Sequence, residues 1–101
     1  MEKIKLAIVE DEPVIRESLT NFFAEHPAIE ISISAKSVED FLEQCYGPKH
    51  AVINLVLLDI GLPGMSGLEG IPHIRKRLPE ADIVMLTTFE EDDKIFKALC
   101  A

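Results

Sequence analysis

Short apolar runs alternate with amphipathic stretches from the start of the chain. Residues 4–9 (IKLAIV) form an aliphatic run that ends at acidic residues, which predicts a buried strand. Pro13 then suits the first turn of a helix, and apolar residues recur with helical spacing until Pro27. Residues 29–34 (IEISIS) alternate between isoleucine and polar residues, so this strand should have one polar face and lie near a sheet edge.

The same alternation continues in the middle of the chain. Ser37, followed three residues later by Asp40, resembles a capping box, although Glu or Gln is the usual partner. It predicts the start of an amphipathic helix that Gly47 and Pro48 should stop. Residues 52–58 (VINLVLL) are almost continuously apolar, which favours a central parallel strand covered on both faces.

A third helix and a fourth strand follow. Ser66 and Glu69 form a second capping box, which predicts a helix ending near Arg77. Pro72 lies inside this stretch and should kink the helix or shift its start. Residues 82–86 (DIVML) predict another short strand.

An acid-rich stretch at residues 90–93 suits the N-terminus of a last helix. Strand and helix therefore alternate along the whole chain. This order predicts an α/β fold with a parallel sheet, helices on both faces and right-handed crossovers. The sequence shows no repeat and no linker, so we expect residues 1–101 to form one domain.

The acidic composition narrows the possible functions. The formal net charge is −8, and the one basic cluster, residues 75–77, suits the C-terminal end of a helix better than a nucleic-acid surface. No apolar run approaches the roughly 18–20 residues that span a bilayer. The N-terminus also lacks the features of a signal peptide. We therefore expect a cytoplasmic segment that binds neither membrane nor DNA directly.

Polar residues stand at the carboxyl ends of three predicted strands. Residues 10–12 (EDE) follow the first strand, Asp59 follows the third and Thr87 follows the fourth. Parallel strands end at one edge of the sheet, where open α/β folds bind ligands, so these side chains should converge. Each has an ordinary explanation when taken alone: an acidic strand end, a turn aspartate or a strand-end threonine. Their joint placement favours a functional site.

Carboxylates that converge repel one another, and a hard divalent cation relieves that repulsion. Asp11 and Asp59 fit as direct magnesium ligands, Glu10 could act directly or through a water, and the backbone carbonyl of Gly61 could complete the set. Beside the metal, Asp59 could attack phosphorus and form an aspartyl phosphate. The Thr87 hydroxyl could then donate a hydrogen bond to a phosphoryl oxygen.

Three stretches in this order carry a family resemblance: VEDEP, LVLLDIGLPGMSGLEGI and IVMLTTFEEDDKIFKAL. Together they resemble the receiver domain of bacterial two-component response regulators, over essentially the whole chain. The resemblance implies a doubly wound, flavodoxin-like sheet. The last stretch looks most like receivers attached to helix-turn-helix transcription factors.

The resemblance also implies roles for individual residues. Asp59 would accept a phosphoryl group from a histidine of a sensor kinase, and Glu10 and Asp11 would hold Mg²⁺. Gly61 would supply a backbone ligand, and Thr87 would be the switch hydroxyl. A further set would shape the loop after the acceptor: Pro63, Gly64 and Gly67.

Receivers of this family continue into a fifth strand and helix, with a switch aromatic and a lysine that pairs with the phosphoryl group. Both would fall beyond Ala101, so we expect four strands here, with Ile83–Leu86 as an edge strand. The chain is then either a fragment of a longer regulator or a protein whose edge another chain covers. In the second case, we expect dimerisation or strand exchange through that edge.

Three functions remain open. The first is a phosphoacceptor switch, which has phosphotransfer chemistry but is not a turnover enzyme. The second is a non-phosphorylatable receiver that serves as an interaction or dimerisation module, which loss of the lysine would favour. The third is an aspartyl-phosphate hydrolase, which would need a second acid where Gly61 stands.

Overall fold

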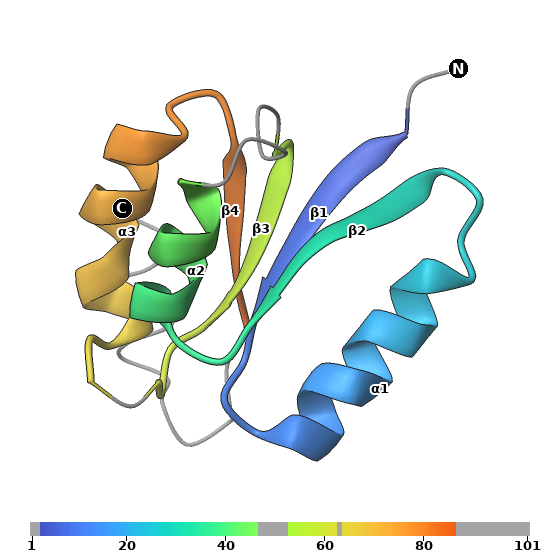
Figure 1. The fold of residues 1–101 in the computed structure, drawn as a ribbon, viewed down its shortest axis with the longest axis horizontal. Helices are drawn as coiled ribbons and strands as arrows, with labels where there is room; N and C mark the ends of the chain where they lie inside the picture. Colours follow the sequence, from blue (N-terminus) through green and yellow to red (C-terminus); the bar gives the residue numbers. More distant parts are fainter. Residues whose placement is uncertain (1–2, 47–52, 63, 87–101) are drawn as a thin grey trace.

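A single sheet of four parallel strands organises the molecule (Figure 1). The computed structural model of the chain describes residues 3–46, 53–62 and 64–86. The strands are ordered β2-β1-β3-β4, as the predicted parallel α/β fold requires. Their bounds are β1 Ile4–Val9, β2 Ile29–Ala35, β3 Leu55–Asp59 and β4 Asp82–Leu86.

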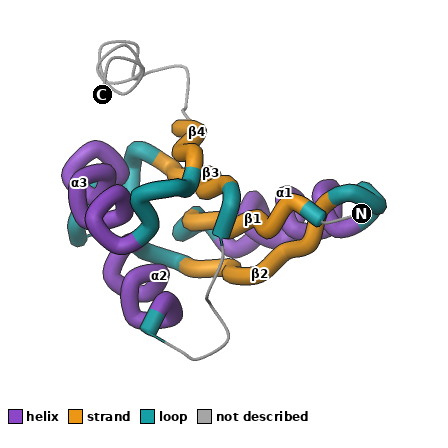
Figure 2. Tube along the Cα trace, turned by 90° about the horizontal axis from the view of Figure 1, so that it is seen from above, coloured by secondary structure: helices purple, strands orange, loops and turns teal. Residues whose placement is uncertain are grey.

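Helices cover both faces of this sheet. Figures 1 and 2 show α1 (Pro13–Ala24) on one side and α2 (Val38–Cys45) with α3 (Gly67–Arg77) on the other. The larger apolar core lies under α2 and α3, around Phe41, Ile74 and alternate residues of the strands. A smaller core lies under α1, where Leu19 and Phe23 pack against buried residues of β1 and β3. The sheet is therefore doubly wound, as the family resemblance implied.

The strand order of the sheet reverses between β1 and β3. The connection from β1 leads outward to β2, and the next one crosses back to β3 on the other side of β1. The two strands pair in register, with Val9 opposite Leu58. In open parallel sheets, such a reversal point opens a crevice beyond the carboxyl ends of the two strands.

The two predicted helix caps differ in detail. At α3 the box is complete, because Ser66 Oγ accepts from the Glu69 N–H and Glu69 Oε1 accepts from the Ser66 N–H, each at 3.1 Å. At α2, Ser37 Oγ accepts from the Asp40 N–H at 3.0 Å. Asp40 Oδ2 then accepts from the Lys36 N–H at 3.2 Å rather than from Ser37. The sequence pattern thus located both helix starts.

The bounds of α3 match the prediction, and one strand boundary differs. Pro72 lies inside α3 and does not shift its start, because the capping box fixes the first turn and buried Ile71 and Ile74 hold the helix on either side of the proline. A kink at Pro72 stays a prediction. The third strand begins at Leu55 instead of residue 52 and includes Asp59. Ile53 is buried outside the strand, so part of the apolar run fills the core from the preceding loop.

Both outer strands match the sequence pattern. β2 lies at one edge with Glu30 and Ser34 exposed, as predicted. β4 forms the other edge among the described residues, and pairing of a second chain along Ile83–Leu86 stays a prediction. The expected fourth helix lies outside the described residues. Within residues 3–46, 53–62 and 64–86, no helix has the length and apolar character needed to cross a bilayer.

Candidate metal centre

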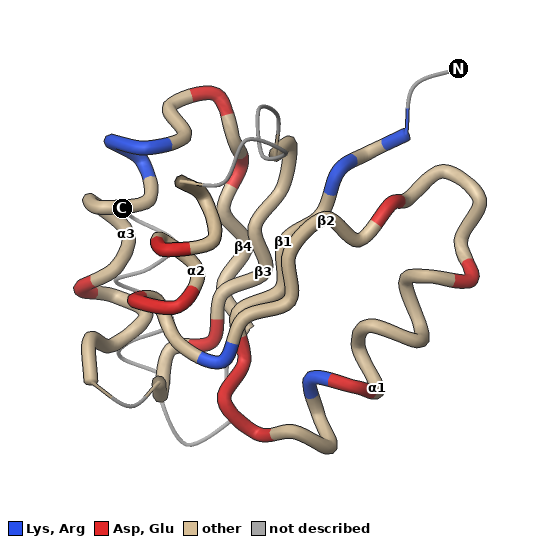
Figure 3. Tube along the Cα trace, viewed as in Figure 1, with Lys and Arg blue, Asp and Glu red and all other residues tan. Residues whose placement is uncertain are grey.

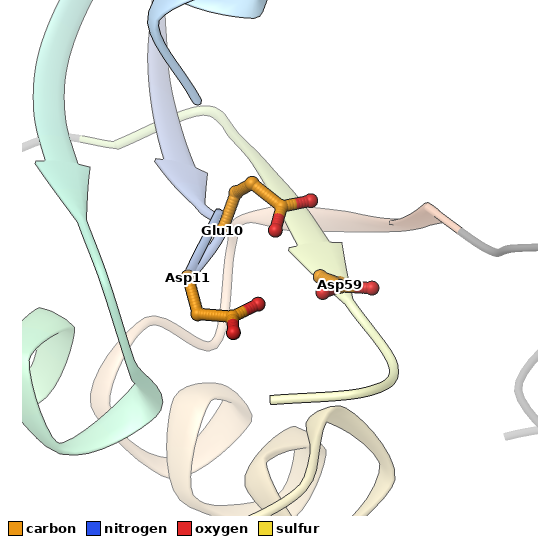
Figure 4. A group of neighbouring side chains, drawn as sticks. All are labelled: Glu10, Asp11 and Asp59. Carbon is orange, nitrogen blue, oxygen red and sulfur yellow. The ribbon is translucent and has the colours of Figure 1, made fainter. Parts of the chain in front are cut away.

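Three carboxylates meet at the reversal point of the sheet. Glu10 and Asp11 follow β1, and Asp59 is the last residue of β3. The register of β1 and β3 brings these positions side by side. Each residue contributes one carboxylate oxygen to a group whose members all lie within 4.8 Å of one another (Figure 4). The structure thus brings together the three carboxylates among the four predicted metal ligands.

The three carboxylates differ in burial. Glu10 is only 6% exposed, Asp59 is partly buried and Asp11 is exposed. Burial, aided by the negative charges of Asp59 and Asp11, raises the pKa of Glu10 to about 7, although a hydrogen bond from the Glu12 N–H opposes this rise. Burial and the Asp11 charge also raise the pKa of Asp59. Without a cation, full ionisation of the cluster is therefore unfavourable.

Backbone groups hold the carboxylates of Glu10 and Asp59 in place. The Glu12 N–H donates to Glu10 Oε2 at 3.0 Å, and the Gly61 N–H donates to Asp59 Oδ1 at 3.3 Å. Arg16 of α1 reaches back to the turn, where its Nη1 donates to the Glu10 carbonyl at 2.8 Å. The turn after β1 is thus tied to the first helix.

A glycine allows α3 to begin directly on the backbone of Asp59. An ideal Cβ on Gly67 would lie 2.1 Å from the Asp59 carbonyl oxygen, so no larger residue fits without displacing the backbone. The Gly67 N–H donates to the Ile60 carbonyl at 3.0 Å. The resemblance implied only that Gly67 shapes the loop, whereas the structure shows that it sets the distance between β3 and α3.

The carboxylates line a pocket of about 270 Å³ that also includes Gly61. Mg²⁺ prefers oxygen ligands, keeps several waters and typically takes one or two carboxylates in such sites. The donor set and the pocket fit a hydrated divalent cation of this kind. An added Cβ at Gly61 would meet nothing within 4 Å, so the small residue here leaves space open and is not required for packing.

Some predicted site residues cannot be placed. Thr87 and Pro63 lie outside the described residues.

Two residues near the site were missed by the sequence reasoning: Arg16 and Glu39. The Oε2 atom of Glu39 accepts a hydrogen bond from the Met65 N–H at 3.1 Å, and Arg16 donates to the Glu10 carbonyl. Neither belongs to a motif used above, and the partners of Glu39 lie far away in sequence.

The fold and the acid cluster define a class: doubly wound α/β domains with a group of carboxylates where the strand order reverses. The sequence model of the response regulator receiver domain family matches residues 6–101. The chain therefore belongs to this family, whose members are signalling proteins.

Relatives and solved structures agree with this assignment. Response regulator protein VraR of Staphylococcus epidermidis is 30% identical over 96 residues, which cover 95% of this chain and 44% of that protein. Transcriptional regulatory protein LnrK of Bacillus subtilis is 30% identical over 96 residues, which cover 95% of this chain and 42% of that protein. The chain thus spans less than half the length of these curated relatives.

Similar folds are found among receiver structures. Response regulator protein TrrA of Thermotoga maritima, solved in complex with Mg²⁺-BeF, has a TM-score of 0.77 and 34% identity over 100% of this chain and 82% of its own. The receiver domain of NarL from Mycobacterium tuberculosis has a TM-score of 0.83 and 22% identity, covering 99% of this chain and 78% of its own. The NarL likeness supports the fold alone.

Proposed function

We propose that this receiver accepts a phosphoryl group on Asp59 in a Mg²⁺-dependent reaction. The observation that carries the proposal is the meeting of Glu10, Asp11 and Asp59 oxygens within 4.8 Å in one pocket. The TrrA structure contains Mg²⁺-BeF and is 34% identical to this chain, which supports the same metal here.

Each residue would have a defined task. Glu10 and Asp11 would hold the metal together with Asp59 and the Gly61 carbonyl. The bound cation would neutralise charge on the phosphoryl oxygens. A free Asp59 oxygen would attack phosphorus, so that an O–P bond forms while the bond from phosphorus to the donor's histidine nitrogen breaks. The Thr87 hydroxyl would donate a hydrogen bond to the phosphoryl group and thereby report its presence.

The proposal also covers the source of the phosphoryl group and the process that the protein controls. A sensor histidine kinase in the cytoplasm would supply the phosphoryl group. LnrK is a transcriptional regulatory protein, and this chain covers 42% of its length, so the output would be transcription. DNA would be bound by an effector part outside this acidic segment, which carries a net charge of −8.

Labelling with acetyl phosphate tests the acceptor directly. With Mg²⁺ present, we expect mass spectrometry to find one phosphoryl group on Asp59, lost in Asp59→Asn and in EDTA. Asp82→Asn is the matched control, because Asp82 is an exposed aspartate at the opposite end of the sheet. Unchanged labelling in Asp59→Asn would refute the assignment. No labelling of the wild type by donor or kinase would favour the alternative of a non-phosphorylatable interaction module.

A further inference from the structure

We infer that Glu39 of α2 is a positioning residue for the proposed reaction, because its carboxylate anchors the loop that follows Asp59. The Met65 N–H donates to Glu39 Oε2 at 3.1 Å across 26 positions of sequence. This inference rests on the proposed function for its effect on rate. The anchoring contact itself can be tested separately.

The loop approaches the carboxylate closely. Gly64 adopts φ +69°, a conformation that favours glycine, and an ideal Cβ there would lie 2.7 Å from Glu39 Oε2. The backbone therefore turns directly over the carboxylate. A side chain at position 64 would be strained and would push against the same oxygen that receives the Met65 hydrogen bond.

At the start of the loop the Ile60 N–H donates to the Leu86 carbonyl of β4 at 3.3 Å. Beyond Ile60, the Met65 bond to Glu39 is the only hydrogen bond that joins the described residues of this loop to a distant part of the chain. Gly61 donates to neighbouring Asp59, and Ser66 exchanges hydrogen bonds with Glu69 of the helix that it caps. Leu62 adds an apolar anchor, since it is buried in the larger core. Among the described residues, Glu39 is thus the polar anchor of the loop's second half.

Local structure fixes Glu39 for this task. It lies in the first turn of α2, where a negative charge is favoured by the helix dipole, and Ser37 caps that turn. Its neighbour Asp40 is already engaged with the Lys36 N–H. A pocket of about 490 Å³ beside Glu39 is also lined by Asp11 of the metal centre, which places the anchored loop next to that centre.

The anchor matters because the loop begins at the acceptor and ends at α3. Asp59 and Gly61 stand at its start, and Gly67 packs against the Asp59 backbone at its end. Displacing a reacting group by about 1 Å can cost as much as a hundredfold in rate. A loose loop would let Asp59 and the Gly61 carbonyl drift from their places around the cation.

Four variants separate anchoring from simple stabilisation of α2. Glu39→Ala removes the acceptor, and Glu39→Gln keeps an amide oxygen that can accept the same hydrogen bond. Glu43→Ala is the matched control, a glutamate one turn later on α2 whose side chain has no hydrogen bond to the loop among the described residues. Ser37→Ala weakens the helix start without touching Met65.

The first measurement is the initial rate of Asp59 labelling by acetyl phosphate at saturating Mg²⁺. We expect a decrease of roughly 3- to 10-fold in Glu39→Ala, as expected for loss of one charge-assisted hydrogen bond with partial compensation by water. Glu39→Gln should stay within about twofold of wild type, Glu43→Ala should match wild type, and Ser37→Ala should lower the rate clearly less than Glu39→Ala does. An equal decrease in Ser37→Ala and Glu39→Ala would overturn the inference, because α2 stability would then explain both.

The second measurement needs no phosphorylation. Amide hydrogen exchange at Met65 should accelerate in Glu39→Ala by about the same factor and stay slow in Glu39→Gln and Glu43→Ala. Unchanged exchange at Met65 in Glu39→Ala would refute the anchor even if labelling were slower. If the wild type takes no phosphoryl group while Met65 exchange responds as expected, the proposed function fails and the anchor stands.

Discussion

Glu10 is the most buried carboxylate of the candidate metal centre, and its surroundings determine how the cluster responds to pH. It is 6% exposed, lies beside Asp11 and Asp59, and receives one hydrogen bond from the Glu12 backbone. In the folded protein it therefore holds a proton more tightly than in the unfolded chain. This gives the metal-free protein a pH-dependent stability.

For the metal-free protein, we expect stability to fall as pH rises from about 4.5 to about 7, since the pKa of Glu10 is raised from 4.5 to about 7. The unfolded chain loses this proton first, so the folded state binds more protons within this window and loses stability with rising pH. The expected decrease is roughly 1–3 kcal/mol, and it levels off above the folded pKa. Urea unfolding in EDTA measures it.

Glu10→Gln provides the comparison for that pH profile. The variant should show a clearly smaller slope over the same pH range, whereas Asp82→Asn, at the far end of the sheet, should keep the wild-type slope. Equal slopes in wild type and Glu10→Gln would show that Glu10 does not carry the effect.

At the scale of secondary structure, α3 and β3 form the unit that places Asp59. The capping box at Ser66 fixes where α3 begins, and Gly67 lets its first turn contact the Asp59 backbone. A side chain at position 67 must therefore move either the helix or the end of the strand. The position of Asp59 in the site therefore depends on this contact.

Gly67→Ala should lower the free energy of unfolding by roughly 1–3 kcal/mol, because overpacking against the backbone forces a shift. It should also weaken Mg²⁺ binding, since Asp59 moves. Gly61→Ala is the matched control, because its Cβ would meet nothing within 4 Å and folding should be nearly unchanged. Chemical denaturation and calorimetric titration of both variants measure the two effects. A Gly67→Ala protein with wild-type stability and affinity would contradict the described contact.

Local sequence patterns predicted the positions of helices and strands well. They predicted contacts between residues far apart in the sequence poorly. The start of α3 follows from Ser66 and Glu69 alone, because a capping box satisfies the first backbone groups from within the segment. Whether Pro72 would shift the start of α3 could not be predicted, since the answer depends on buried Ile71 and Ile74 packing in the larger core. The Glu39 contact to Met65 has no sequence signal either, because it arises only when α2 meets the loop.

At the scale of the whole molecule, the topology brings distant acidic residues together. The strand-order reversal makes β1 and β3 neighbours, so acids separated by almost 50 positions meet at one rim. The sequence predicted this convergence because only the parallel alternation of strand and helix was needed. Figure 3 shows the basic end of α3 away from this rim, and the last turn of that helix contains Arg75, Lys76 and Arg77.

The central claim is that Glu10, Asp11 and Asp59 share one cation. Calorimetric titration of the wild-type chain with Mg²⁺ tests it most directly. We expect one ion per chain, at least about tenfold weaker binding in Asp11→Asn and in Asp59→Asn, and wild-type affinity in Asp82→Asn. Equal affinity in all four proteins, or binding lost only in Asp82→Asn, would contradict the shared site.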